Sequence, residues 1–275
     1  MIDRRAGATA TSAAPAVDLA TLRLALVAGL SLVAWIALAL WSVSPYSRYL
    51  EHGGWADAGL LGELCRSFPQ GSWIIPALIY SVAWLLMITA MMLPTTLPLL
   101  GIFGRVVAGR PDAGTLLGRV IVGYGIAWLG FGLAAHGLDS LLHAGAAQLG
   151  WLTGRGWIVG AIVLAGAGAF QFSALKYRCL EKCRTPFGFV NQRWHGLAPR
   201  REALRIGIDH GIFCVGCCWA LMAVMFVVGM GNLGWMLVVA AAMAAEKNLR
   251  WGRRLRTPLG LGLIAWAGIM VAINV

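Results

Sequence analysis

Charged residues are scarce in this 275-residue sequence. Asp, Glu, Lys and Arg together make up 12% of it, whereas hydrophobic residues make up 59% and the mean hydropathy is +0.76. So few polar side chains could not cover the surface of a soluble globular domain. The composition therefore excludes a soluble enzyme or binding domain and predicts an integral membrane protein.

Acidic residues are the rarest charged class, with 11 Asp and Glu against 22 Lys and Arg, so that the net charge is +11. Such an excess can indicate a nucleic-acid partner, and the positions of the basic residues must decide. Apolar runs long enough to cross about 30 Å of hydrocarbon lie near 22–42, 73–100, 119–143, 156–175, 211–229, 232–247 and 258–274. Of the 22 basic residues, 19 fall in alternate connections between these runs. This asymmetry predicts seven transmembrane helices, a cytoplasmic N-terminus and an outer C-terminus, with no nucleic-acid partner.

Other absences narrow the architecture further. The sequence has no convincing internal repeat, no phosphate-binding glycine loop and no nucleophile elbow. We expect an all-α, polytopic membrane helix bundle in which residues 1–21 form a flexible cytoplasmic tail and residues 22–275 form one transmembrane domain. A loop over 43–72 would fold across its outer mouth. Small residues that allow close helix approach recur in the third predicted span, at Gly123, Gly125, Gly130 and Gly132.

Soft, metal-ligating side chains are concentrated in the fifth predicted span, in "DHGIFCVGCCWALM" at 209–222. At 100° per residue one helical face collects, within about 140° of arc, His210, Cys214, Cys217, Cys218, Met222 and Met225. Cys179 and Cys183 lie at the base of the preceding span, where they could face this stripe. The pattern predicts a metal site.

The redox compartment supports that interpretation. The predicted topology places Cys179, Cys183, Cys214, Cys217 and Cys218 at or near the cytoplasmic side, where thiols stay reduced and disulfides are rare. A buried cysteine can also be an inert, small hydrophobic residue. That alternative remains open for each thiol taken singly.

Two further groups are candidates. In "WLLMITAMMLPTTLP" at 84–98, Met87 and Met91 share a face with Pro94 and Pro98, and thioethers suit Cu(I). Irregular backbone at membrane depth is tolerated only where protein or a cavity surrounds it. The third span ends with His136, Asp139 and His143 within about 60° of arc, a secondary site suited to Cu(II), Zn(II) or Fe(II). Core packing and a solvated helix face are the respective alternatives.

The segments "AMMLPTTLPLL", "QFSALKYRCLEKCRTPFGF", "GIDHGIFCVGCCWALMAVMFVVGMGNLGWM" and "EK" at 246–247 resemble a bacterial family of predicted metal-binding, multi-pass integral membrane proteins. The resemblance covers about residues 75–250. It implies a bacterial inner-membrane location and a metal site drawn from the His210, Cys214, Cys217, Cys218, Cys179 and Cys183 set. It implies no reaction.

Four functions are therefore in competition. The first is soft-metal handling or delivery, with copper favoured over zinc or iron because imidazole, thioether and thiolate donors follow one another across the predicted membrane. The second is a metal-dependent membrane oxidoreductase resembling a monooxygenase. The third is a thiol–disulfide couple at Cys214 and Cys217, and the fourth is an assembly subunit of a membrane metalloenzyme complex. The expected partners are the lipid bilayer, a metal ion, and other membrane subunits or a metal chaperone.

Overall fold

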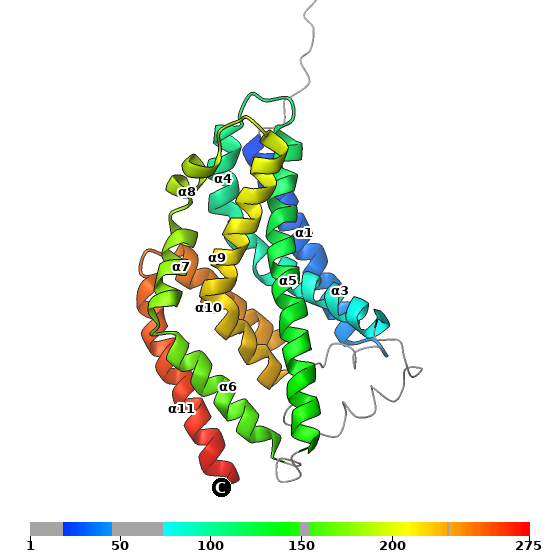
Figure 1. Cartoon of the computed structure of the whole chain (residues 1–275), viewed down its shortest axis with the longest axis vertical. Helices are drawn as coiled ribbons and strands as arrows, with labels where there is room; N and C mark the ends of the chain where they lie inside the picture. Colours follow the sequence, from blue (N-terminus) through cyan, green and yellow to red (C-terminus); the bar gives the residue numbers. More distant parts are fainter. Residues whose placement is uncertain (1–18, 46–73, 149–154, 230) are drawn as a thin grey trace, which may run out of the picture.

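The computed structural model describes residues 19–45, 74–148, 155–229 and 231–275 (Figure 1). These residues are predominantly helical and contain no strand, so the all-α prediction is confirmed. The α-helices are α1 (Leu19–Ser42), α3 (Ile74–Met91), α4 (Leu97–Val106), α5 (Ala113–Gln148), α6 (Gly156–Phe170), α7 (Ala174–Arg184), α8 (Pro186–Arg193), α9 (Pro199–Val228), α10 (Leu233–Asn248) and α11 (Arg256–Asn274). Most of the predicted tail and of the loop over 43–72 lies outside the described residues.

Among the described residues, four helices are long and apolar enough to cross a membrane. The number rises to six if each of two bent helix pairs counts as one span. Helix α10 matches the sixth predicted span but has only 16 residues. At 1.5 Å per residue that is about 24 Å, short of the roughly 30 Å of a hydrocarbon core. Seven spans are therefore not confirmed, and the orientation of the chain stays a prediction.

The span predicted at 73–100 is broken near its middle. Helix α3 ends at Met91, a 3₁₀ turn covers Leu93–Thr96, and α4 continues at an angle of 52° to α3. Pro94 and Pro98 lack the N–H groups that a continuous helix needs here, as the sequence predicted. Thr95, in this break, is buried inside the protein.

A second break separates α6 from α7, which meet at 63°. The Ser173 hydroxyl caps the new helix by accepting a hydrogen bond from the backbone N–H of Lys176 at 3.1 Å. This bend turns α7 so that it packs along α9. It therefore positions the two cysteines of α7 near those of α9.

Glycines bring α5 and α9 into backbone contact, and the two helices lie side by side along most of the bundle (Figure 1). A Cβ atom added to Gly207 would lie 2.1 Å from the carbonyl oxygen of Val120, and one added to Gly123 would lie 2.2 Å from that of Leu204. Only glycine fits such an approach. The predicted role of Gly123 is confirmed, whereas Gly125 faces open space.

Helix α10 packs against α3, α7 and α9, so residues distant in sequence meet in the largest buried cluster. Helices α6 and α11 pair with each other on one side of the molecule (Figure 1). The predicted site residues of α3, α7 and α9 therefore converge on one interior region.

Candidate metal centre

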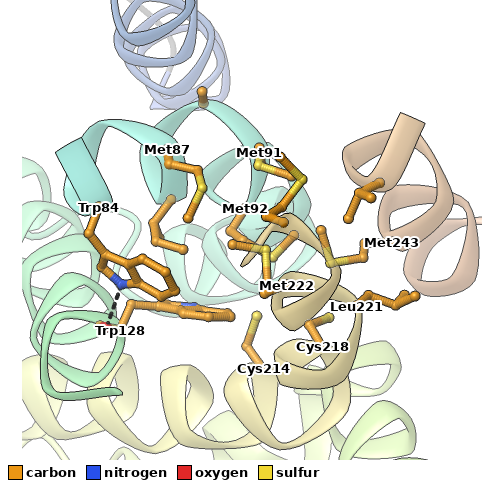
Figure 2. Packing of buried hydrophobic residues seen from close by; sticks show 14 of the residues in the cluster. Trp84, Met87, Met91, Met92, Trp128, Cys214, Cys218, Leu221, Met222 and Met243 are labelled. Atoms are coloured by element: carbon orange, nitrogen blue, oxygen red, sulfur yellow. Dashed lines mark hydrogen bonds between the residues drawn. The ribbon is translucent and has the colours of Figure 1, made fainter. Parts of the chain in front are cut away.

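The largest buried cluster is rich in sulfur. It contains four of the six cysteines and seven of the ten methionines in the chain, the latter being Met87, Met91, Met92, Met222, Met225, Met236 and Met243. Each of these methionines is at most 3% exposed. Figure 2 shows the sulfur atoms of Met91, Met92, Met222 and Met243 gathered between α3, α9 and α10. A core lined with thioethers in this way offers soft donors.

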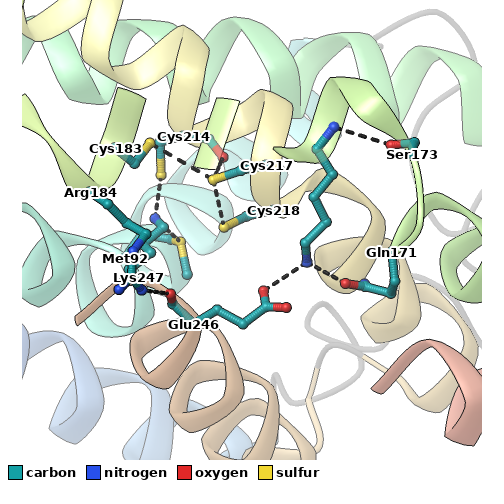
Figure 3. Close-up of polar contacts among 11 residues, drawn as sticks. Met92, Gln171, Ser173, Cys183, Arg184, Cys214, Cys217, Cys218, Glu246 and Lys247 are labelled. Carbon is teal, nitrogen blue, oxygen red and sulfur yellow. Dashed lines mark hydrogen bonds and ion pairs between the residues drawn. The ribbon is translucent and has the colours of Figure 1, made fainter. Parts of the chain in front are cut away.

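Three thiols form a continuous row at the edge of this cluster (Figure 3). The Sγ atoms of Cys183 and Cys217 are 3.8 Å apart, and those of Cys217 and Cys218 are 3.4 Å apart. All the described cysteines are free. We refer to Cys183, Cys217 and Cys218 as the thiol row.

The spacing within the thiol row is compatible with a shared metal ion. Two sulfurs that each bond one soft ion at about 2.3 Å can be no more than about 4.6 Å apart, and both neighbouring pairs lie inside this limit. In the described part of the chain, however, no group of three or more His, Cys, Asp or Glu side chains is arranged to hold a metal. The sulfur distances therefore allow neighbouring thiols to share an ion, but they do not define a complete metal site among the described residues.

Cys214 lies one helical turn before the row and makes different contacts. Its Sγ is 2.9 Å from the Tyr124 hydroxyl and accepts a hydrogen bond from Lys247 Nζ at 2.8 Å. The same ammonium donates to Thr95 Oγ1 at 3.2 Å and approaches Met92 Sδ at 3.8 Å. A charged side chain from α10 thus bridges the thiol of α9 and the broken segment after α3.

The sequence reasoning did not find Tyr124, Met92 or Lys247 as site residues. It counted both Lys247 and Lys176 among the basic residues of the connections, but the side chains are buried, with exposed fractions of 7% and 1%. Because they are buried, these two lysines should not be counted as loop charges when the orientation of the chain is predicted. The available signal for Lys247 was the "EK" pair at the end of an otherwise apolar segment.

A buried ion pair fixes α10 beside α7. Lys176 Nζ donates to Glu246 Oε2 at 2.7 Å and also to Gln171 Oε1. Arg184 adds hydrogen bonds to the backbone carbonyl oxygens of Glu246 and, at 2.8 Å, of Leu249. A buried charge must be paired to be tolerated. These contacts hold the helix that carries Cys183 against the helix that carries Lys247.

Two predicted ligands, His210 and Cys179, are not part of the thiol row. His210 is 3% exposed, its Nδ1 has no hydrogen-bond partner within the described residues, and its ring lies 6.0 Å from that of Tyr124. Cys179 is half-buried, and its Sγ would be 2.6 Å from a Cβ added to Gly216. It therefore packs on the α9 backbone.

The secondary candidate at the far end of α5 is only partly described. The His136 ring stacks on that of Tyr80 with centroids 4.3 Å apart, and Asp139 is half-buried. The side chain of His143 lies outside the described residues. This group therefore stays a prediction.

Comparisons with known proteins give one match. A family model described as "PpoB2: Copper chaperone" matches residues 81–270, which is more than half of the chain and includes every candidate ligand named above. No curated protein and no solved structure matches the chain.

Proposed function

The chain belongs to the PpoB2 family of copper chaperones, and on that premise we propose that it holds Cu(I) inside a membrane-embedded helix bundle and delivers it to a partner. The family membership supports copper handling in general. The membrane setting, the ligands and the route are our proposals, each argued below from the described residues.

The observation that carries the proposal is the thiol row inside a core lined with methionine. Thiolate and thioether sulfurs select Cu(I), whereas zinc and iron are more often bound with imidazole or carboxylate as well. The row is nearly dry, since Cys217 and Cys218 are each 1% exposed and Cys183 is 8% exposed. Burial protects a bound Cu(I) ion from water and oxygen. We assign Cys217 as the central cargo ligand, which would share Cu(I) with Cys183 or with Cys218, and Cys214 lies one helical turn away.

The remaining predicted ligands then mark a route. Met87 and Met91 are buried in the same cluster as the thiols and would pass Cu(I) along α3. Thioethers are neutral and bind more weakly than thiolates, as a transfer step requires. His210, whose ring lies 6.0 Å from that of Tyr124, would take part in capture or release, whereas Cys179 packs on the α9 backbone and is not needed to hold the ion. His136, Asp139 and His143 would be an outer receiving point.

The membrane setting rests on the four to six helices that could cross a bilayer. Many large hydrophobic side chains on α1 and α11 are exposed on the surface of the isolated protein, among them Leu32, Val33, Leu40, Leu261 and Ile269. Contiguous exposed apolar surface requires lipid or a partner. We propose a bacterial inner-membrane protein with a cytoplasmic N-terminus, whose partners are the bilayer, a soluble metal chaperone or other membrane subunits.

Copper retention by the purified protein tests this function. The protein is loaded anaerobically with Cu(I), Zn(II) or Fe(II), desalted in the presence of a weak chelator, and assayed for each element. We expect Cu(I) to be retained at one or more equivalents per chain and the other two metals to be lost. Retention of zinc alone, or of no metal, would contradict a copper-handling role for these thiols.

A further inference from the structure

The ammonium group of Lys247 lies in a position that a metal ion could occupy. Nζ donates to three atoms around it, namely Cys214 Sγ at 2.8 Å, Thr95 Oγ1 at 3.2 Å and Met92 Sδ at 3.8 Å. Each of these atoms could also be a metal ligand. The residues carrying these atoms are each at most 7% exposed. Figure 3 shows the thiol of Cys214 and the thioether of Met92 close to the Lys247 ammonium, and the Thr95 hydroxyl completes its surroundings.

This cation has no carboxylate partner. Glu246, its neighbour in sequence, is directed toward Lys176, and the ion pairs in the described part of the chain do not include Lys247. A buried ammonium without a counter-charge would be strongly destabilising. The contact at 2.8 Å makes Cys214 Sγ the counter-ion that the geometry offers, in its thiolate form.

Copper(I) and an ammonium group carry the same charge, and the donors around Lys247 suit the metal better. A thioether is a poor partner for an ammonium but a good ligand for Cu(I). Met92 is placed there by the proline break after α3, where the backbone leaves the helix. The side chain of Lys247 can leave, because the next residues, Asn248 and Leu249, are exposed and the lysine stem is flexible.

We propose that Cys214 and Met92 form a second Cu(I) position, which Lys247 fills in the copper-free protein and vacates when copper arrives. This inference rests on the proposed function and adds a release mechanism to it. The exchange replaces one monovalent cation by another: the Cys214 thiolate loses its hydrogen bond from the ammonium and gains a bond to Cu(I). No electron is transferred. The returning ammonium restores the ion pair and favours release of the metal to a partner.

Lys247 should therefore weaken equilibrium copper binding at this position. The lost contact is a hydrogen bond between charged groups, which corresponds to roughly a ten- to hundredfold change in an equilibrium constant. In Lys247→Leu, an uncharged side chain without a metal-binding atom replaces the competing cation. We expect this variant to bind its weakest copper equivalent about ten- to hundredfold more tightly and to release it correspondingly more slowly.

The affinity measurement uses the full-length protein, competition with a colorimetric Cu(I) chelator, and Met92→Leu as a second variant. Met92→Leu should weaken the same equivalent, because it removes the thioether and keeps the volume. Met270→Leu is the matched control, since Met270 packs in a separate cluster near Gly160. Unchanged affinity and release in Lys247→Leu, or an equal loss in Met92→Leu and Met270→Leu, would overturn the proposal.

A measurement on the unaltered protein covers the case in which Lys247→Leu does not fold. A membrane-permeant, amine-reactive reagent is applied with and without Cu(I), and modification is located by mass spectrometry. Lys247 should become more reactive on copper loading, whereas Lys176, buried in its pair with Glu246, should not. No change at Lys247 would refute the displacement. Loss of all copper retention would refute the proposed function itself, so the two failures are distinguishable.

Discussion

The Cys217→Ala variant tests whether Cys217 is a copper ligand or only a packing residue. Cys217 occupies the middle of the thiol row, with Cys218 Sγ at 3.4 Å, Cys183 Sγ at 3.8 Å and the Cys214 carbonyl oxygen accepting its hydrogen bond at 3.2 Å. Removing one buried sulfur costs about 1–2 kcal/mol of packing, and the lost hydrogen bond adds about 1 kcal/mol. We expect a destabilisation of about 2–3 kcal/mol, which the fold should survive.

The effect on copper should be much larger than the effect on stability. Both neighbouring sulfur pairs of the row include Cys217, so the variant leaves no described pair of row thiols within bonding range of one ion. We expect Cys217→Ala to insert and fold, as monitored by size-exclusion chromatography and thermal unfolding in detergent. It should lose the Cu(I) equivalent held by the thiol row and keep at most the weaker equivalent proposed at Cys214 and Met92. Cys179→Ala is the matched control, because it removes a thiol that lies outside the row, and it should retain copper. Full copper content in Cys217→Ala would show that the row is only core packing.

Three further predictions follow from other parts of the structure. Gly207→Ala should greatly reduce the yield of folded protein, because the added Cβ would lie 2.1 Å from a backbone oxygen of α5. Gly125→Ala, whose Cβ would meet open space, should leave the yield unchanged. Equal yields of the two variants in size-exclusion chromatography would contradict the observed packing of α5 on α9. Met91→Leu should slow Cu(I) loading and preserve the final copper content, at a packing cost under about 1.5 kcal/mol. Met270→Leu should load at the original rate. If stopped-flow measurements show an unchanged loading rate in Met91→Leu, α3 has only a structural role. A membrane-impermeant thiol reagent should label the half-buried Cys179 in inverted membrane vesicles and not in intact cells, and labelling from outside would reverse the proposed orientation.

The local features of the fold could be predicted from the sequence. Pro94 and Pro98 predicted the break after α3, because proline removes a helix hydrogen bond regardless of its tertiary surroundings. Gly123 predicted a close helix contact, although its partner on α9 and the different environment of Gly125 could not be known from spacing alone. The helix count was less secure, because the apolar run at 232–247 is only 16 residues long, like α10, and so falls short of the roughly 20 residues that a span needs.

The candidate site was predictable in part. The 100° periodicity placed Cys214, Cys217 and Cys218 on one buried stripe, and all three are at most 1% exposed. Periodicity says nothing about which neighbouring helix faces the stripe. The contact of Cys183 with Cys217, and that of Lys247 with Cys214, depend on the bend before α7 and on the path of α10.

The coordination of Cu(I) in the loaded protein tests the central claim most directly. X-ray absorption at the copper edge reports the oxidation state, the ligand elements and their distances. The account predicts Cu(I) bound mainly by sulfur, with bonds close to the roughly 2.3 Å of a zinc–sulfur bond, and loss in Cys217→Ala of the copper equivalent held by the thiol row. A first shell dominated by nitrogen or oxygen, or an unchanged amount of sulfur-bound copper in that variant, would contradict the assignment of the thiol row as the place where the protein holds copper.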